Sequence, residues 1–213
     1  MKQRLLYPLL KIFFRLLYGA FAWTYDWVAA AVSLGMWKGW VLSVLPYLDG
    51  ERTLELGHGP GHLQQALCRA GRNPFGLDGS PQMSRLARTR LTRKGCYVRL
   101  ARGHAQRLPF AQGSFDRVAA TFPTEYIVDA DTLAEIWRVL APQGRLIVLP
   151  VAWITGENWP HRLAASLFRI TGQAAEWDDR FLQPLRQAGF EVHLEPIAQR
   201  NSRLVIIVAR KPE

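Results

Sequence analysis

The fold of this chain is decided by one stretch, Glu55-Leu56-Gly57-His58-Gly59-Pro60-Gly61. The stretch follows a short apolar run and opens onto a helical pattern, which together predict a strand, a glycine turn and a helix. Glycine has no Cβ, so the backbone N–H groups of the turn can approach a ligand closely. The helix N-terminus behind the turn adds unpaired donors and the positive end of a dipole. We therefore expect a small ligand with a carboxylate or another anionic group here.

The spacing of the glycines indicates which ligand this is. A dinucleotide fingerprint reads G-x-G-x-x-G, whereas here the third glycine, Gly61, comes one place earlier. The charge of Glu55 would repel a pyrophosphate and suits a ligand with an ammonium group, such as S-adenosyl-L-methionine (SAM). The E-x-G-x-G-x-G run resembles motif I of the class I SAM-dependent methyltransferases. That resemblance implies SAM as the cofactor.

Three further segments resemble the same family in the same order. Residues 103–110 read G-H-A-Q-R-L-P-F and are similar to the family's G-D-A-x-x-L-P-F, in which the aspartate accepts a hydrogen bond from the adenine amino group. This chain has His104 at that position, where a neutral imidazole could accept the bond or stack on the adenine. Residues 114–118 resemble the family's S-F-D-x-V strand, and residues 138–146 resemble its R-V-L-x-P-G-G-R-L turn.

A carboxylate at the end of the expected second strand completes the predicted cofactor site. Ligands of doubly wound sheets bind beyond the carboxyl ends of the strands. Asp78 lies there, about twenty residues after the glycine turn, and can accept hydrogen bonds from both ribose hydroxyls. The predicted cofactor-binding residues are Tyr25, Glu55, Gly57, His58, Gly59, Gly61, Asp78, Gly79, Ser80, Met83, His104, Ala105 and Thr121.

The pattern of apolar segments predicts the fold class. Strand-like and helix-like segments alternate, which favours a parallel sheet with helices on both faces. The last two strands are too close for a parallel crossover and are expected to form an antiparallel hairpin. The prediction is a Rossmann-like α/β fold with a seven-stranded, mostly parallel sheet. We expect strands at residues 53–56, 74–77, 97–101, 115–120, 145–149, 191–196 and 204–209. We expect helices at residues 63–70, after Ser80, after a capping box of Thr132 and Glu135, and near 160–170 and 179–188.

The chain is predicted to divide into a helical cap, residues 1–48, and a SAM-binding domain, residues 49–213. Residues 1–18 place basic side chains along one stripe of a helix and Leu, Phe and Tyr around it. This is typical of a helix in a membrane interface, but a helix that covers the domain explains it equally well. Asp26 disfavours a membrane span over residues 16–37. The region from Tyr25 to Trp40 resembles the N-terminal region of ubiquinone and menaquinone biosynthesis methyltransferases, which implies that Tyr25 helps close the cofactor site.

Composition limits the partners. The net charge of +10 favours an anionic partner, either nucleic acid, an anionic membrane or an acidic substrate. Arg85, Arg88, Arg90, Arg93 and Lys94 cluster on one expected helix, with Arg99, Arg102 and Arg107 nearby. Two cysteines provide neither a disulfide framework nor a zinc motif, so we expect two free thiols in a reducing compartment. The expected location is cytoplasmic, with peripheral contact at the inner face of the membrane.

Methyl transfer from a sulfonium needs alignment more than side-chain catalysis, so no catalytic residue is assigned. Glu125, Tyr126 and His104 are positional candidates for a general base. His58 and His62 lack a third metal ligand, so no metal is expected. The sequence after the expected fourth strand lacks the D/N-P-P-Y motif of amino-methyltransferases, and neither cysteine follows a proline as cytosine C5 enzymes require.

The hypothesis is methyl transfer to a hydrophobic or lipid-like acceptor, such as a headgroup amine or a quinone, at a membrane surface. Three alternatives stay open. The chain could be a soluble small-molecule methyltransferase with an aromatic lid, an RNA methyltransferase, or a SAM-binding protein without transfer activity. Nucleic acid is the less favoured partner, and the sequence does not determine the oligomeric state.

Overall fold

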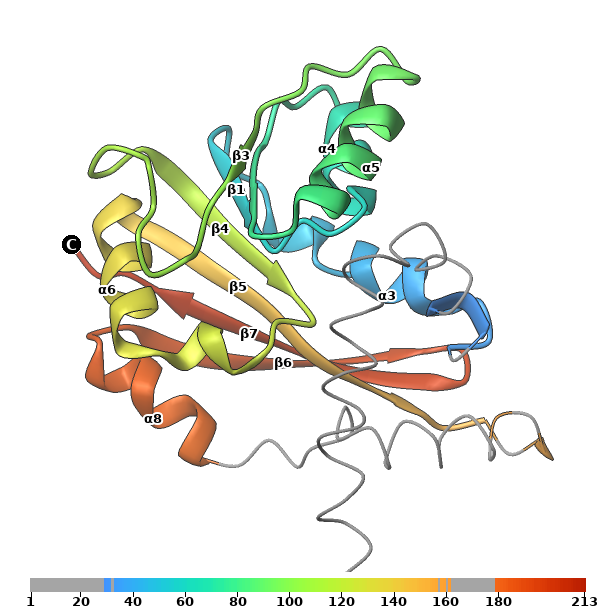
Figure 1. Cartoon of the computed structure of the whole chain (residues 1–213). Coiled ribbons are helices and arrows are strands. Elements are labelled where there is room, and N and C mark those ends of the chain that lie inside the picture. Colours follow the sequence, from blue (N-terminus) through green and yellow to red (C-terminus); the bar gives the residue numbers. More distant parts are fainter. Residues whose placement is uncertain (1–28, 32, 157, 160, 162–178) are drawn as a thin grey trace, which may run out of the picture.

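The computed structural model of the chain describes residues 29–31, 33–156, 158–159, 161 and 179–213. Its strands are β1 (Thr53–Leu56), β2 (Phe75–Asp78), β3 (Leu100–Arg102), β4 (Phe115–Thr121), β5 (Leu140–Ile154), β6 (Glu191–Gln199) and β7 (Ser202–Arg210). They form a seven-stranded sheet in the order β3-β2-β1-β4-β5-β7-β6 (Figure 1). β1 to β5 pair in parallel, and β7 is antiparallel to both β5 and β6. The predicted Rossmann-like fold with its C-terminal antiparallel hairpin is confirmed.

Helices cover both faces of this sheet (Figure 1). The α-helices are α3 (Trp37–Leu42), α4 (His62–Arg69), α5 (Pro81–Thr92), α6 (Ala130–Val139) and α8 (Asp179–Gln187). Two short 3-10 helices are η2 (Leu45–Tyr47) and η3 (Glu125–Val128). The α8 helix confirms the pattern predicted near residues 179–188. The helix expected near 160–170, the interfacial helix of residues 1–18, Tyr25 and Asp26 lie outside the described residues.

Side chains along β5 point alternately to the two faces of the sheet, and the core therefore has two layers. Leu146 and Val148 pack in one buried cluster with side chains of α6 and α8. Ile147 and Leu149 pack in the other cluster, with side chains of α3 and α4. Successive strand residues point to opposite faces, so a central strand buried on both faces reads as one continuous apolar run. This explains why residues 145–149 were recognisable as a strand.

One buried tryptophan joins α3 to β7, the last strand along the chain. The Trp40 side chain is fully buried, and its Nε1–H donates to Ser202 Oγ at 3.0 Å. Trp37 stacks on Phe122 with 4.2 Å between ring centroids. The helix that precedes the glycine turn is therefore packed directly on the sheet.

The predicted capping box of Thr132 and Glu135 is wrong. The N-cap of α6 is Asp129, whose carboxylate accepts from Thr132 N, so the helix begins three residues earlier than a Thr132 cap requires. Glu135 instead accepts from Leu108 N at 2.6 Å and pairs with Arg138. The S/T-x-x-E pattern coincided with an aspartate three residues upstream, and aspartate is at least as good a cap as threonine.

The expectation of two free thiols is also wrong. Cys68 in the last turn of α4 and Cys96 after α5 form a disulfide, with Cα atoms 5.9 Å apart. The pairing follows from α4 and α5 lying side by side, which no spacing of two cysteines reveals in advance. Free thiols therefore do not support a reducing compartment for this protein.

Other boundaries shift by a few residues. β3 begins at Leu100, so Tyr97 lies in the loop before it. β5 runs to Ile154 because it keeps pairing with β7 until Ile154 meets Ser202. Of the described helices, none is long and apolar enough to cross a membrane.

We expect the Ser202→Ala variant to lower the free energy of unfolding by about 1–3 kcal/mol, because it removes the acceptor of a buried donor. Urea unfolding measures this change. The matched variants are Trp40→Phe and the double variant that carries both changes. If the hydrogen bond causes the loss, the change in unfolding free energy of the double variant differs from the sum of the two single changes. A Ser202→Ala protein as stable as the wild type would contradict the role of this contact.

Candidate cofactor-binding site

The glycine turn between β1 and α4 has the conformation that its sequence predicts. Gly57, Gly59 and Gly61 have φ angles of +66°, +50° and +83°, a region that other residues rarely adopt. Gly57 N donates to Leu77 O at 2.8 Å, which ties the turn to the end of β2. A Cβ on Gly59 would meet no atom within 4 Å, so there is space for a ligand beside this part of the backbone.

The carboxylate of Asp78 joins the turn to the next helix. Its Oδ2 accepts from Gly59 N at 2.9 Å, and its Oδ1 accepts from Ser80 N at 2.8 Å. Each carboxylate oxygen has further lone pairs, so these bonds leave capacity for ribose hydroxyls. The Asp78 carboxylate lies at the carboxyl end of β2, where such sheets bind ligands.

Glu55 lies in the interior, below the turn. Its side chain is 1% exposed, and Oε2 accepts from Gln64 Nε2 at 2.9 Å. Gln64 also donates to Phe75 O at 3.1 Å, so it uses both amide hydrogens to join α4, β1 and β2. Burial, together with the charge of Asp78, raises the pKa of Glu55 to about 8, although the Gln64 hydrogen bond opposes this shift. Without a ligand, Glu55 is therefore mostly protonated at neutral pH, and a nearby ammonium group would favour its ionised form.

His58 points in the same inward direction. The ring is 3% exposed, and Nδ1 lies 2.7 Å from Gly59 O, so Nδ1 carries the proton. Burial lowers the pKa of His58 and keeps the ring neutral. Its Nε2 is buried with no hydrogen-bond partner among the described residues. Nε2 is thus a buried acceptor whose hydrogen-bonding capacity is not used by the described residues.

Gly76 on β2 makes room for this polar cluster. A Cβ there would lie 3.0 Å from His58 Cδ2, 3.2 Å from Gln64 Nε2 and 2.8 Å from Leu100 Cδ2. Sequence reasoning missed both Gly76 and Gln64. The available signal was a glycine inside a strand, which marks a close approach of another group.

The remaining predicted residues of the cofactor side lie along the start of α5 and the end of β3. Ser80 is the N-cap of α5, as predicted, and its Oγ accepts from Met83 N at 3.2 Å. Met83 is buried in the core. The His104 ring lies 3.4 Å from the Cβ position of Gly79. This brings His104 beside Gly79, the residue that follows Asp78, whereas Ala105 is buried.

On the other side of the turn, η3 brings one candidate base close. The Tyr126 hydroxyl lies 3.0 Å from the Cβ position of Gly57, although the two residues are far apart in the sequence. Thr121, at the end of β4, is half-buried, and Glu125 is exposed. Of the three candidate bases, Tyr126 thus lies beside Gly57, and His104 lies beside Gly79. In the described part of the chain, no three His, Cys, Asp or Glu side chains form a metal site.

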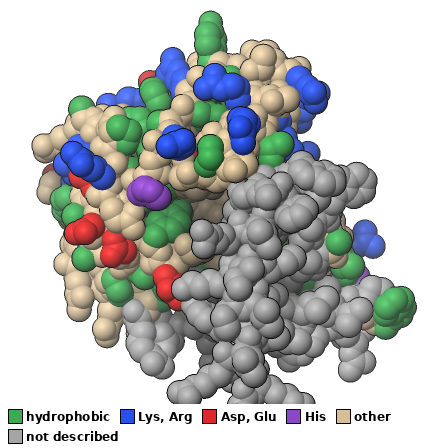
Figure 2. All heavy atoms as spheres, in the orientation of Figure 1, with side chains coloured by type: hydrophobic (Ala, Val, Ile, Leu, Met, Phe, Trp, Pro, Cys, Tyr) green, Lys and Arg blue, Asp and Glu red, His purple; other side chains and the backbone are tan. Residues whose placement is uncertain are grey.

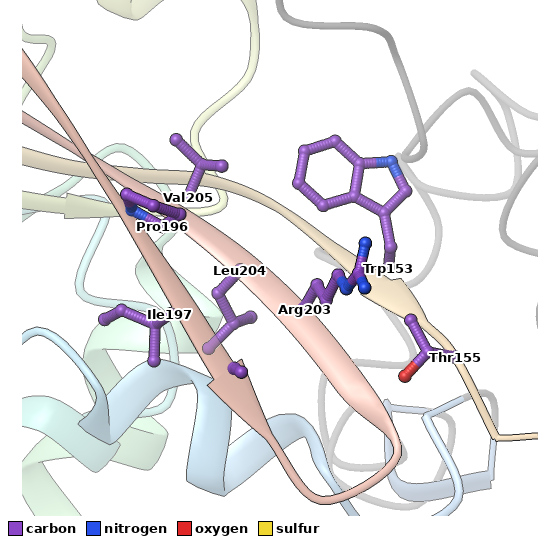
Figure 3. Close-up of a pocket in the computed structure, with 8 residues that line it drawn as sticks. Trp153, Thr155, Pro196, Ile197, Arg203, Leu204 and Val205 are labelled. Atoms are coloured by element: carbon purple, nitrogen blue, oxygen red, sulfur yellow. The ribbon is translucent and has the colours of Figure 1, made fainter.

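A separate cavity of about 560 Å³ lies near the hairpin turn between β6 and β7, beside the end of β5 (Figure 3). Its apolar lining includes Trp153, Pro196 and Val205, and it carries the charged side chain of Arg203. Trp153 lies near the carboxyl end of β5, and parallel strands end at one edge of a sheet. The cavity is therefore at the same sheet edge as the glycine turn.

Comparisons with known proteins agree with this geometry. Residues 54–148 match the model of a family described as "Methyltransferase domain". The demethylmenaquinone methyltransferase of Deinococcus radiodurans is 34% identical over 142 residues, which cover 62% of this chain and 58% of that protein. The ubiquinone/menaquinone biosynthesis C-methyltransferase UbiE of Bordetella parapertussis is 37% identical over 134 residues, which cover 59% of this chain and 51% of that protein. The chain thus spans a little over half the length of these relatives.

Solved structures share the fold. Phosphoethanolamine N-methyltransferase 2 of Haemonchus contortus, in a complex with S-adenosylhomocysteine, superposes with a TM-score of 0.61 at 18% identity, covering 84% of this chain and 53% of that one. Geranyl diphosphate C-methyltransferase of Streptomyces coelicolor gives a TM-score of 0.62 at 14% identity, covering 81% and 78%. These likenesses define a class I SAM-dependent methyltransferase fold.

Residues 54–148 therefore resemble a methyltransferase domain of the class I SAM-dependent kind, and solved neighbours with the same fold hold S-adenosylhomocysteine or SAM. Both predictions made from the sequence are confirmed. The open backbone at Gly59 and the Asp78 carboxylate, which joins the turn after β1 to the start of α5, fit a ligand that carries a ribose.

The pKa of Glu55 gives a prediction about stability. Its pKa is higher in the folded chain than in the unfolded one, so the folded state holds the proton between about pH 4.5 and 8. Stability is therefore greatest below this range and falls as pH rises through it. Relative to Glu55→Gln, the wild type should lose roughly 1 kcal/mol for each pH unit from 5 to 8. Urea unfolding at several pH values measures this, with Glu51→Gln as the exposed control. Parallel curves for the wild type and Glu55→Gln would contradict the burial of this carboxyl group.

Proposed function

We propose that this protein transfers a methyl group from SAM to a hydrophobic, lipid-like acceptor of the quinone class. The observation that carries the proposal is the 34–37% identity to relatives named for menaquinone and ubiquinone methylation. The matched family segment, residues 54–148, contains the whole glycine turn, Asp78 and Tyr126. Because the chain is shorter than those relatives, its activity and its acceptor are both proposals.

Residues of the turn would bind and orient the donor. SAM, when bound, supplies a methyl group that a sulfonium activates. Asp78 would accept from the ribose hydroxyls, while the backbone N–H groups at the start of α4 would face the carboxylate. Glu55 would lose its proton as the ammonium group approaches. Such positioning can lower a barrier by roughly 7–11 kcal/mol without a nucleophilic side chain.

Tyr126 is the best placed of the three candidate bases. Its hydroxyl lies against Gly57, in the turn that would hold the donor. Transfer to a carbon atom forms a C–CH3 bond and releases a proton from the acceptor, and a hydroxyl at this place could hold or relay that proton. Glu125, by contrast, is exposed, and His104 lies beside Gly79.

The proposed acceptor is further supported by the cavity at the β5–β7–β6 ribbon. Its apolar lining suits a hydrocarbon chain, and Arg203 could face a polar or anionic group. A membrane-resident acceptor also agrees with the amphipathic pattern of residues 1–18. Action at the membrane surface is therefore part of the proposal.

A transfer assay tests this proposal. With SAM carrying a labelled methyl group, we expect label to enter a demethylmenaquinone with a short side chain, presented in detergent micelles. Tyr126→Phe should lower kcat by about tenfold or more and leave the KM for SAM within about twofold, because it removes a proton-transfer group and keeps the ring. Tyr47→Phe, in η2, is the matched control.

Two outcomes would contradict the proposal. A protein that binds S-adenosylhomocysteine but labels only soluble small molecules or RNA would refute the lipid-like acceptor. Equal kcat values for Tyr126→Phe and the wild type would refute the role of the hydroxyl.

A further inference from the structure

Nearly all of the net charge of this chain lies in one stretch. Residues 56–115 contain ten Arg and Lys residues and a single carboxylate, Asp78. The other 153 residues contain 17 basic and 16 acidic residues, and are thus almost neutral. The stretch comprises α4, β2, α5 and β3, and β3 is an edge strand of the sheet. The charge is therefore gathered at one end of the domain.

The α5 helix directs this charge outward. Met83, Ala87 and Leu91 form its buried side, whereas Arg85 and Arg88 are exposed on the other side. Arg93, Lys94 and Arg102 follow in the chain and are also exposed. We call these five residues, Arg85, Arg88, Arg93, Lys94 and Arg102, the α5 face. Figure 2 shows Lys and Arg side chains gathered over the upper part of the molecule, where Figure 1 places α4 and α5.

The basic residues of the α5 face have few partners within the chain. The ion pairs found in the described segments join Arg52 to Asp116, Arg117 to Asp49 and Arg138 to Glu135, all outside this face. Arg99 lies outside this face, over the ring of Phe75 in the core layer of α6, 5.1 Å from the ring centroid. A surface that carries so many like charges without carboxylates is suited to an external anion.

An exposed aromatic residue lies within the same surface. Tyr97 is 76% exposed and follows Cys96, whose disulfide to Cys68 ties this loop to α4. Tyrosine favours the boundary between water and lipid, because its ring is apolar and its hydroxyl is polar. The α5 face therefore combines cations with an aromatic residue held on a fixed loop.

We infer that the α5 face binds the anionic surface of a lipid bilayer, an inference that rests on the proposed lipid-like acceptor. The exposed side of a helix can present several cations to a plane at the same time, and each adds to the attraction by anionic lipid headgroups. Phosphate groups of nucleic acid share this chemistry. A bilayer is favoured because the proposed acceptor resides in one, and because Tyr97 suits its interface.

Flotation with vesicles tests the inference on the full chain. We expect binding to vesicles of 30% phosphatidylglycerol in phosphatidylcholine to be at least tenfold tighter than to phosphatidylcholine alone at low salt. Added salt should weaken this difference, because it screens exposed charges. Arg85→Glu combined with Arg88→Glu should remove most of the difference. The control with the same change in net charge is Lys38→Glu combined with Arg200→Glu, which are exposed residues of other elements and should reduce binding no more than twofold.

Several results would overturn the inference. These are equal binding to both vesicle types, equal losses in the two double variants, or tighter binding to a single-stranded RNA that the α5 variant loses. Circular dichroism and S-adenosylhomocysteine binding report whether each variant folds. The flotation experiment contains no acceptor, so failure of vesicle binding is distinguishable from failure of methyl transfer to a quinone.

Discussion

The site depends on one carboxylate that holds two loops together. Asp78 accepts from Gly59 N in the turn after β1 and from Ser80 N at the start of α5. Charge-assisted bonds of this kind are stronger than neutral ones, and they fix the distance between the carboxyl ends of two neighbouring strands. The space over Gly59, the N-cap of α5 and the place of His104 beside Gly79 all follow from that distance.

Beneath these loops lies a cluster of buried polar side chains. Glu55, Gln64 and His58 are buried around Gly76, where the missing side chain makes room for two of them. Burying a carboxyl group raises its pKa and costs free energy. Gln64 offsets part of this cost with its two hydrogen bonds. Such an arrangement is understandable if the cluster serves a ligand at the turn, because perturbed groups concentrate at functional sites.

The parts of the structure that sequence analysis predicted are those that local patterns determine. The glycine turn, the Ser80 cap with Pro81, and the strand at residues 145–149 all follow from residue types at fixed spacings. The Asp129 cap was missed because two capping patterns overlap in the same segment. The contacts of Gln64, the room at Gly76, the Cys68–Cys96 disulfide and the approach of Tyr126 to Gly57 join segments that are distant in the sequence. No local pattern contains that information, so they appear only in the folded chain.

A crystal structure with S-adenosylhomocysteine bound tests the role of Asp78 most directly, because it shows which groups Asp78 contacts. We expect the Asp78 carboxylate to accept from both ribose hydroxyls and the adenine to lie beside His104. A nucleoside bound at full occupancy whose ribose makes no contact with Asp78 would contradict it.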